Sequence, residues 1–84
     1  MNALECDIYR STKRDYLYVF VQADEGLSRV PGKLLEKFGE PEKVLTLMLT
    51  EESVLAKEDP VKILSNLLQN GYHLQLPPTE ESFV

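Results

Sequence analysis

The stretch that decides the fold is Cys6–Gln22, CDIYRSTKRDYLYVFVQ. Two β-rich runs, Cys6–Arg10 and Tyr16–Gln22, flank the polar turn Ser11–Asp15, so this stretch predicts an antiparallel hairpin. Side chains alternate between the two faces of a strand, and in Tyr16–Val21 (YLYVFV) both alternating sets are apolar or aromatic. We therefore expect this strand to be covered on both sides by other elements.

Outward from the hairpin, the chain predicts a helix and a further strand. Pro31 suits the first turn of a helix that Gly39 ends, with an apolar stripe between them. Lys43–Thr50 (KVLTLMLT) then has the near-continuous apolar character of an interior strand. By contrast, Cys6–Arg10 includes Asp7 and Arg10, and we expect it nearer to an edge of the sheet.

The second half of the chain predicts one more helix and the last strand. Asp59-Pro60 combines a capping residue with a proline at the first helical position, and Asn70-Gly71 ends the helix. Tyr72–Leu76 is the last strand, which Pro77-Pro78 terminates. Ser53–Lys57 is either a short extra strand or a connector.

These elements give the order β-β-α-β-α-β in an α/β (mixed α+β) domain covering residues 1–78. We expect a mixed sheet of four to five strands with some parallel pairing, packed by helices in an α/β/α sandwich. The tail at residues 79–84 starts with Thr79–Ser82, which has the pattern of a cap and an acidic first helical turn. It predicts a C-terminal helix that is truncated or absent.

Composition excludes several classes of function. A net charge of −5 on 84 residues disfavours binding to nucleic acid or anionic membranes over the whole surface. The single Cys6 cannot form an internal disulfide, and no Cys/His spacing predicts a metal site. No phosphate-binding or dinucleotide fingerprint is present, no apolar run is long enough for a membrane helix, and no signal peptide is recognisable. We expect a cytoplasmic monomer without metal or cofactor.

Basic residues in this acidic chain form the main candidate site. Three cations lie in or next to the hairpin turn, namely Arg10, Lys13 and Arg14. Three more recur every four residues along the first helix if that helix extends back to Arg29, namely Arg29, Lys33 and Lys37. The tyrosines Tyr9 and Tyr16 lie near the turn in the sequence. Brought together, they would hold a phosphate or carboxylate and stack on a base. Alternatively, the cations are solvated, with Arg10 and Arg29 paired to nearby aspartates.

Two other features have a functional and a structural interpretation. Cys6 and His73 would make a nucleophilic dyad if they met, or else are a buried thiol and a half-exposed strand histidine. Tyr72–Pro78 borders a groove for a peptide or a C-terminal segment, or else contributes its apolar residues to the core. Neither assigns a catalytic residue.

Five motifs in order along the chain make it similar to the YcgL family of small proteobacterial proteins. They are Cys6-x-Ile-Tyr-Arg-Ser-x-Lys-Arg14, Tyr16-Leu-Tyr-Val19, Ser28-Arg-Val-Pro31, Phe38-Gly39-x-Pro41 and Gly71-Tyr-x-Leu-Gln-Leu-Pro-Pro78. The resemblance implies a compact α/β/α sandwich and no assigned activity, catalytic residue, cofactor or substrate. Some members are encoded near ribonuclease D, an association that points toward RNA metabolism.

Residues and resemblance together favour a small non-enzymatic binding or adaptor domain. Its basic hairpin and helix face would bind RNA or an RNA-processing protein, a phosphorylated ligand, or an acidic protein partner. The alternative is a small enzyme that acts on an anionic substrate through arginine and tyrosine.

Overall fold

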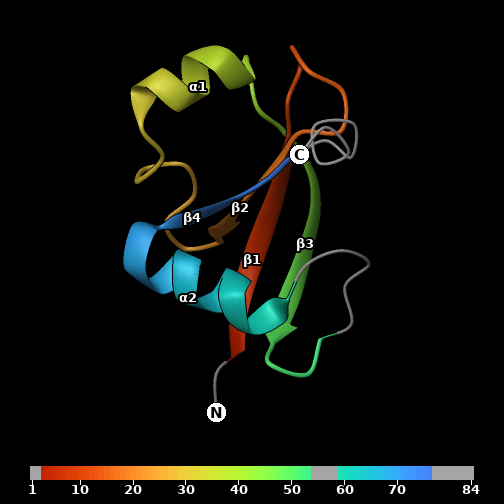
Figure 1. The fold of residues 1–84 in the computed structure, drawn as a ribbon, viewed down its shortest axis with the longest axis vertical. Coiled ribbons are helices and arrows are strands. Elements are labelled where there is room, and N and C mark those ends of the chain that lie inside the picture. Colours follow the sequence, from red (N-terminus) through yellow and green to blue (C-terminus); the bar gives the residue numbers. More distant parts are fainter. Residues whose placement is uncertain (1–2, 54–58, 77–84) are drawn as a thin grey trace, which may run out of the picture.

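The structure is a computed structural model that describes residues 3–53 and 59–76. Within them the elements follow the expected order β-β-α-β-α-β (Figure 1), namely β1 (Ala3–Arg10), β2 (Tyr18–Gln22), α1 (Gly32–Phe38), β3 (Glu42–Thr50), α2 (Pro60–Asn70) and β4 (Tyr72–Gln75). The mixed α+β class is therefore confirmed. Apart from Ser53, the expected extra strand at Ser53–Lys57 falls outside the described residues, and so does the helical start at Thr79–Ser82.

The four strands form one sheet in the order β3-β1-β2-β4, and all three pairings are antiparallel. The expectation of parallel pairing is wrong. The chain leaves β2, passes through α1 and returns as β3 in the direction of β2, but β1 lies between these two strands. Because the helical connection skips one strand, the two strands of like direction are not neighbours.

The positions of β1 and β3 in the sheet are the reverse of those expected. β1 is an interior strand and β3 is an edge. The buried carboxylate of Asp7 on β1 accepts a 2.6 Å hydrogen bond from the Thr46 hydroxyl of β3 and lies 3.6 Å from the Lys43 ammonium. A polar residue is tolerated inside the sheet because its neighbouring strand supplies the partners. On β3, by contrast, Leu45 and Met48 remain exposed.

The two helices cover opposite faces of the sheet, as the two-sided pattern of β2 requires. On one face α2 packs over β1, β2 and β3, in a cluster of Cys6, Ile8, Phe20, Leu49, Ile63, Leu64 and Leu67. On the other face α1 and the segment before it pack on β2, in a cluster of Leu17, Val19, Val21, Val30 and Phe38. This arrangement agrees with the expected α/β/α sandwich.

Local capping explains where both helices begin and end. Asp59 caps α2 by accepting a 3.0 Å hydrogen bond from the Val61 amide, and Gly71 ends it in the left-handed conformation, as predicted. Helix α1 ends as predicted at Gly39, whose amide donates to the Leu35 carbonyl at 2.9 Å. It begins only at Gly32, directly after Pro31.

Candidate functional site

The loop between β1 and β2, residues 11–17, is fastened to the end of α1 rather than free in solvent. The Ser11 hydroxyl donates to the Phe38 carbonyl at 2.5 Å and accepts the amides of Lys13 and Arg14, each at 3.0 Å. The Thr12 amide also donates to the Phe38 carbonyl, at 3.2 Å. The bonds from Ser11 and Thr12 both use the Phe38 carbonyl, which the C-terminus of α1 leaves without an intrahelical partner, so they stabilise loop and helix together.

A hydrogen bond from Lys13 and the lack of a side chain at Gly39 bring the loop into close contact with the end of α1. The Lys13 ammonium donates to the Glu36 carbonyl at 2.8 Å, where a cation is favourable at the negative end of the helix dipole. A Cβ on Gly39, at φ +82°, would lie 2.6 Å from the Thr12 hydroxyl and 2.8 Å from the Lys13 side chain. Glycine is therefore required at this position, and Lys13 has a structural role.

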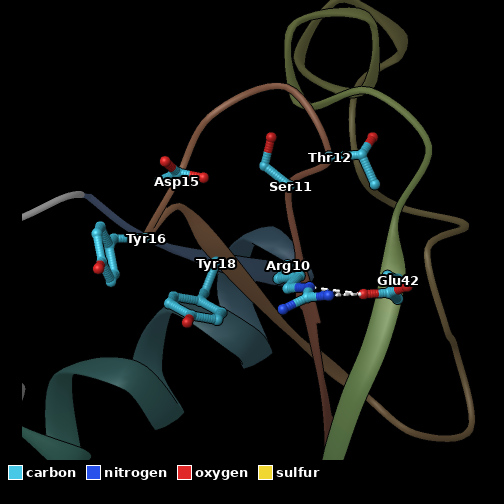
Figure 2. A pocket seen from close by; sticks show the side chains of 7 residues that line it. All are labelled: Arg10, Ser11, Thr12, Asp15, Tyr16, Tyr18 and Glu42. Atoms are coloured by element: carbon cyan, nitrogen blue, oxygen red, sulfur yellow. Dashed lines mark hydrogen bonds and ion pairs between the residues drawn. The ribbon is translucent and has the colours of Figure 1, made fainter.

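The docked loop borders a polar pocket of about 520 Å³, lined by Arg10, Ser11, Thr12, Asp15, Tyr16, Tyr18 and Glu42. In Figure 2 the rings of Tyr16 and Tyr18, the Arg10 side chain and Glu42 follow one another beneath the loop. Sheet register explains this row, because Arg10 is paired with Tyr18 on β2 and with Glu42 on β3. Three adjacent strands therefore position one side of the pocket.

Arg10 and Glu42 form the electrostatic centre of the pocket. The Arg10 Nε donates to Glu42 Oε1 at 2.6 Å, and a second guanidinium nitrogen forms an ion pair with the same oxygen. Both side chains are about half exposed, so water screens this pair and its contribution to the stability of the fold is small. With Asp15 included, the lining carries one cation and two carboxylates.

Tyr16 is the most unusual residue of the pocket. Its φ is +64°, and it is the single residue other than glycine with positive φ among residues 3–53 and 59–76. The tyrosine is 67% exposed, whereas the next residue, Leu17, is 5% exposed and packs in the α1 cluster. The left-handed backbone thus turns Leu17 into the core and leaves the aromatic ring in solvent, at a conformational cost of about 1–2 kcal/mol.

A second, apolar pocket of about 210 Å³ adjoins the first through Tyr18, which lines both. Its other lining residues are Ile8, Phe20, Val44, Leu45 and Gln75. It lies on the α2 face of the sheet, next to the part that α2 covers. Gln75 belongs to the segment Tyr72–Pro78, for which the sequence left open a groove or a core role. Tyr72 and Leu74 pack against the cluster on the α1 face, as the core role requires, whereas Leu76 is exposed.

The structure brings together two of the residues proposed from sequence, Arg10 and Tyr16. Lys13 and Arg14 lie in the loop but do not line the pocket, while Tyr9 packs on the α1 face. Lys33 and Lys37 are exposed on α1, which covers that same opposite face. The pocket-lining residues that sequence reasoning missed are Ser11, Thr12, Asp15, Tyr18 and Glu42; a hairpin closing on Arg10 would have indicated Tyr18 as its neighbour.

Arg29 is placed at the other end of the sheet. It precedes α1, lies 3.6 Å from the Glu25 carboxylate, and donates to the Gln69 carbonyl at 3.2 Å. Its side chain packs against Gly71, at the start of β4, whereas the pocket adjoins the opposite end of that strand. The cationic stripe expected if the helix reached Arg29 therefore does not form, and the basic residues do not make one face.

The alternative of a Cys6 and His73 dyad is wrong. Cys6 is fully buried on β1 and its thiol donates to the Leu4 carbonyl at 3.4 Å, whereas His73 lies on β4, beyond β2, with Nδ1 2.8 Å from the Asn66 amide nitrogen. Burial, followed by the charges of Asp7 and Glu5, raises the pKa of Cys6 from 9.0 to about 11. A thiol that stays protonated at neutral pH is a poor nucleophile.

The described part of the chain, residues 3–53 and 59–76, offers neither a metal site nor a membrane-spanning helix. No group of three or more His, Cys, Asp or Glu residues there is arranged to hold a metal ion. Nor does that part contain a helix of the length and apolarity needed to cross a membrane.

Fold and site together define a small α/β/α domain with a pocket of tyrosine, arginine and carboxylate side chains at one end of an antiparallel sheet. The YcgL domain matches residues 6–78, and the chain belongs to the YcgL family. It is 46% identical to a YcgL domain-containing protein of Pseudomonas paraeruginosa and 47% identical to one of Pseudomonas putida. A YcgL domain-containing protein of Azotobacter vinelandii is 48% identical, and each alignment covers 94% of this chain and 81% of the relative.

Proposed function

We propose that this protein is a non-enzymatic adaptor domain of the bacterial cytoplasm that binds a segment of a protein partner in the pocket beside the β1–β2 loop. Tyr16 and Tyr18 take a flat or apolar group of the partner, and Arg10 takes a carboxylate in exchange for Glu42. A reducing cytoplasm suits a chain whose one cysteine is a buried free thiol.

The observation that carries this proposal is the conformation of Tyr16. A residue with φ +64° and 67% exposure contributes strain and little packing to the fold, so its ring is best explained by a contact outside the chain. Tyrosine and arginine are the residue types that dominate the energetic centres of protein interfaces. Here they occur side by side in a concave site.

Charge favours a protein over a nucleic acid as the partner. The pocket lining holds two carboxylates against one arginine, and the molecule carries a net charge of −5. Lys13 is bound to the end of α1 and Arg29 to the end of α2, so neither extends the positive charge of Arg10. A run of phosphates would meet the carboxylates of Asp15 and Glu42 beside the one arginine that lines the pocket.

Single-stranded RNA is the second candidate, since two exposed or half-exposed tyrosine rings beside an arginine also make a stacking platform. The two candidates differ in their response to salt and nuclease. A protein segment held by aromatic contacts is retained as the salt concentration rises, whereas RNA dissociates steeply.

The test is a quantitative pull-down from extract of a bacterium that carries a YcgL protein, with and without nuclease. Wild type is compared with Tyr16→Ala and Arg10→Ala, and with Lys33→Ala, an exposed change on the opposite face. We expect wild type and Lys33→Ala to capture the same protein with and without nuclease. The amount captured should fall at least tenfold in Tyr16→Ala and in Arg10→Ala. Capture that is unaffected by Tyr16→Ala refutes the proposal, and capture abolished by nuclease favours RNA instead.

A further inference from the structure

Among the strands of residues 3–53 and 59–76, β3 is the longer of the two edge strands. It spans nine residues at one side of the sheet, while β4, the other edge, spans four. An edge strand presents backbone amides and carbonyls that can pair with another strand, and proteins usually protect such an edge with lysine, proline or an irregularity. Here the bulge near Ile8 and Tyr9 affects the Lys43 end of the strand, and from Leu45 to Thr50 the register is regular.

The direction of the backbone groups on β3 follows from the pairing of β1. The Glu5 carbonyl accepts the Ala23 amide on the β2 side at 2.8 Å, so the even-numbered residues of β1 point their amides and carbonyls toward β3. Cys6 is paired with Leu47, and the residues that alternate with Leu47 therefore direct their backbone groups outward. These residues are Thr46, Met48 and Thr50, and the Thr50 amide indeed donates away from the sheet, to the Ser53 hydroxyl at 2.9 Å.

The side chains of this edge are apolar and exposed. Val44 is 45% exposed, Leu45 50% and Met48 60%, so one strand holds three of the large hydrophobic residues that the described part of the chain leaves in solvent. No charged residue occurs between Val44 and Thr50. The charges lie at the two ends, with Glu42 and Lys43 before this stretch and Glu51 and Glu52 after it.

We propose that β3 is a self-association surface, and that two copies of this chain pair their β3 strands antiparallel about a two-fold axis at Leu47. In this register Thr46 of each copy is opposite Met48 of the other, and these residues exchange backbone hydrogen bonds through groups that already point outward. Leu47 meets Leu47 of the second copy, and Leu45 meets Leu49, on the face that carries α2. The two sheets become one of eight strands.

The strand is complementary to itself in charge as well as in hydrogen bonding. An antiparallel two-fold at Leu47 brings Lys43 of each strand opposite Glu51 of the other, at both ends of a neutral apolar stretch. Glu42 comes opposite Glu52, but Glu42 already forms an ion pair with Arg10 of its own chain. An isologous contact of this kind closes at two copies and leaves β4 as the outer edge of each. This pairing would replace the monomer expected from the sequence, and it does not depend on the proposed role of the loop pocket.

The first experiment is sedimentation equilibrium of the full chain over concentrations up to about 1 mM, which detects dissociation constants up to about that value. We expect the apparent mass to rise from 9.6 kDa toward twice that value with concentration. Met48→Lys places a charge on the edge and should move the midpoint at least tenfold higher. Leu68→Lys is the matched control, because Leu68 is 56% exposed on α2, and it should leave the midpoint unchanged.

A cross-link tests the register itself. Cysteine at position 47 would face its counterpart across the two-fold at about 4.5 Å between Cα atoms, within reach of a disulfide. Cys6 is the register partner of Leu47, so the variant is made as Cys6→Ala with Leu47→Cys. We expect a disulfide dimer on mild oxidation, and none for Cys6→Ala with Leu68→Cys at the same concentration.

The outcomes decide the proposal whether or not the variants fold. A wild-type chain that stays at 9.6 kDa up to about 1 mM overturns it, and so does a dimer that Met48→Lys leaves intact. Equal cross-linking at positions 47 and 68 also contradicts it, since random collision would explain both. If Met48→Lys or the cysteine variants fail to give the native circular dichroism spectrum, the wild-type concentration series decides alone.

Discussion

Replacing Tyr16 by glycine should stabilise the fold relative to replacing it by alanine, the reverse of the usual order. Both variants remove the ring, so the comparison isolates the backbone at φ +64°. Alanine keeps the left-handed penalty of about 1–2 kcal/mol, which glycine avoids. Glycine loses about 0.5–1 kcal/mol through the greater entropy of its unfolded chain. The midpoints of these two ranges leave Tyr16→Gly more stable than Tyr16→Ala by about 0.75 kcal/mol.

Urea denaturation followed by circular dichroism measures this difference. With a slope of about 1.5 kcal/mol per molar urea, the midpoint of Tyr16→Gly should lie about 0.5 M above that of Tyr16→Ala. Lys62, exposed in α2, provides the control pair, and there glycine should be less stable than alanine by about 1 kcal/mol. If alanine is the more stable substitution at both positions, Tyr16 is not strained and the argument for its functional role is lost.

Three further predictions concern the core and its buried polar groups. Thr46→Val removes the 2.6 Å hydrogen bond to the buried Asp7 and should lower the free energy of unfolding by about 1–3 kcal/mol. A double-mutant cycle with Asp7→Asn measures the coupling, and Thr46→Val should cost less when Asp7→Asn is already present. Leu67→Ala, at a position with no exposure, should cost about 2–5 kcal/mol, whereas Leu68→Ala, 56% exposed in the same helix, should change stability by less than about 0.5 kcal/mol. Because the pKa of Cys6 is raised in the folded state from 9.0 to about 11, its contribution to stability is complete below pH 9 and is lost above it. Wild type should therefore lose about 2 kcal/mol more than Cys6→Ala between pH 8 and pH 11, and parallel pH profiles of the two proteins would contradict this.

The elements could be predicted from sequence because their signals are local. Asp59-Pro60 and Gly71 fix the ends of α2 through a hydrogen bond from a cap and a left-handed glycine, both of which depend on a few adjacent residues. The alternation in Tyr18–Val21 requires cover on both faces of β2, and each face has its own helix, although the strand begins at Tyr18 and not at Tyr16 as the sequence predicts. Such patterns lie within one turn or one strand, so the elements can be predicted without knowledge of the tertiary contacts.

The order of the strands could not be predicted in the same way. KVLTLMLT has the composition of an interior strand, yet β3 lies at the edge, and the polar β1 lies inside because Thr46 and Lys43 satisfy Asp7. Composition measures how apolar a strand is, but its place depends on which partner supplies hydrogen bonds across the sheet. The same limit explains the missing parallel pair, since a helical connection fixes the direction of the next strand and not its neighbour.

For the candidate site too, some features could be predicted from the sequence and others depend on the tertiary structure. The sequence by itself determined the order of the elements, the need for cover on both faces of β2, the family, and the presence of Arg10 and Tyr16 near one hairpin. Only the tertiary structure decided that Lys13 binds the end of α1, that Arg29 lies at the far end of the sheet, and that Tyr18 and Glu42 join Arg10 in a pocket. The physical reason is that charge and aromaticity are properties of single residues, whereas a binding site is made by the register of three strands and by the hydrogen bonds that hold one loop against a helix.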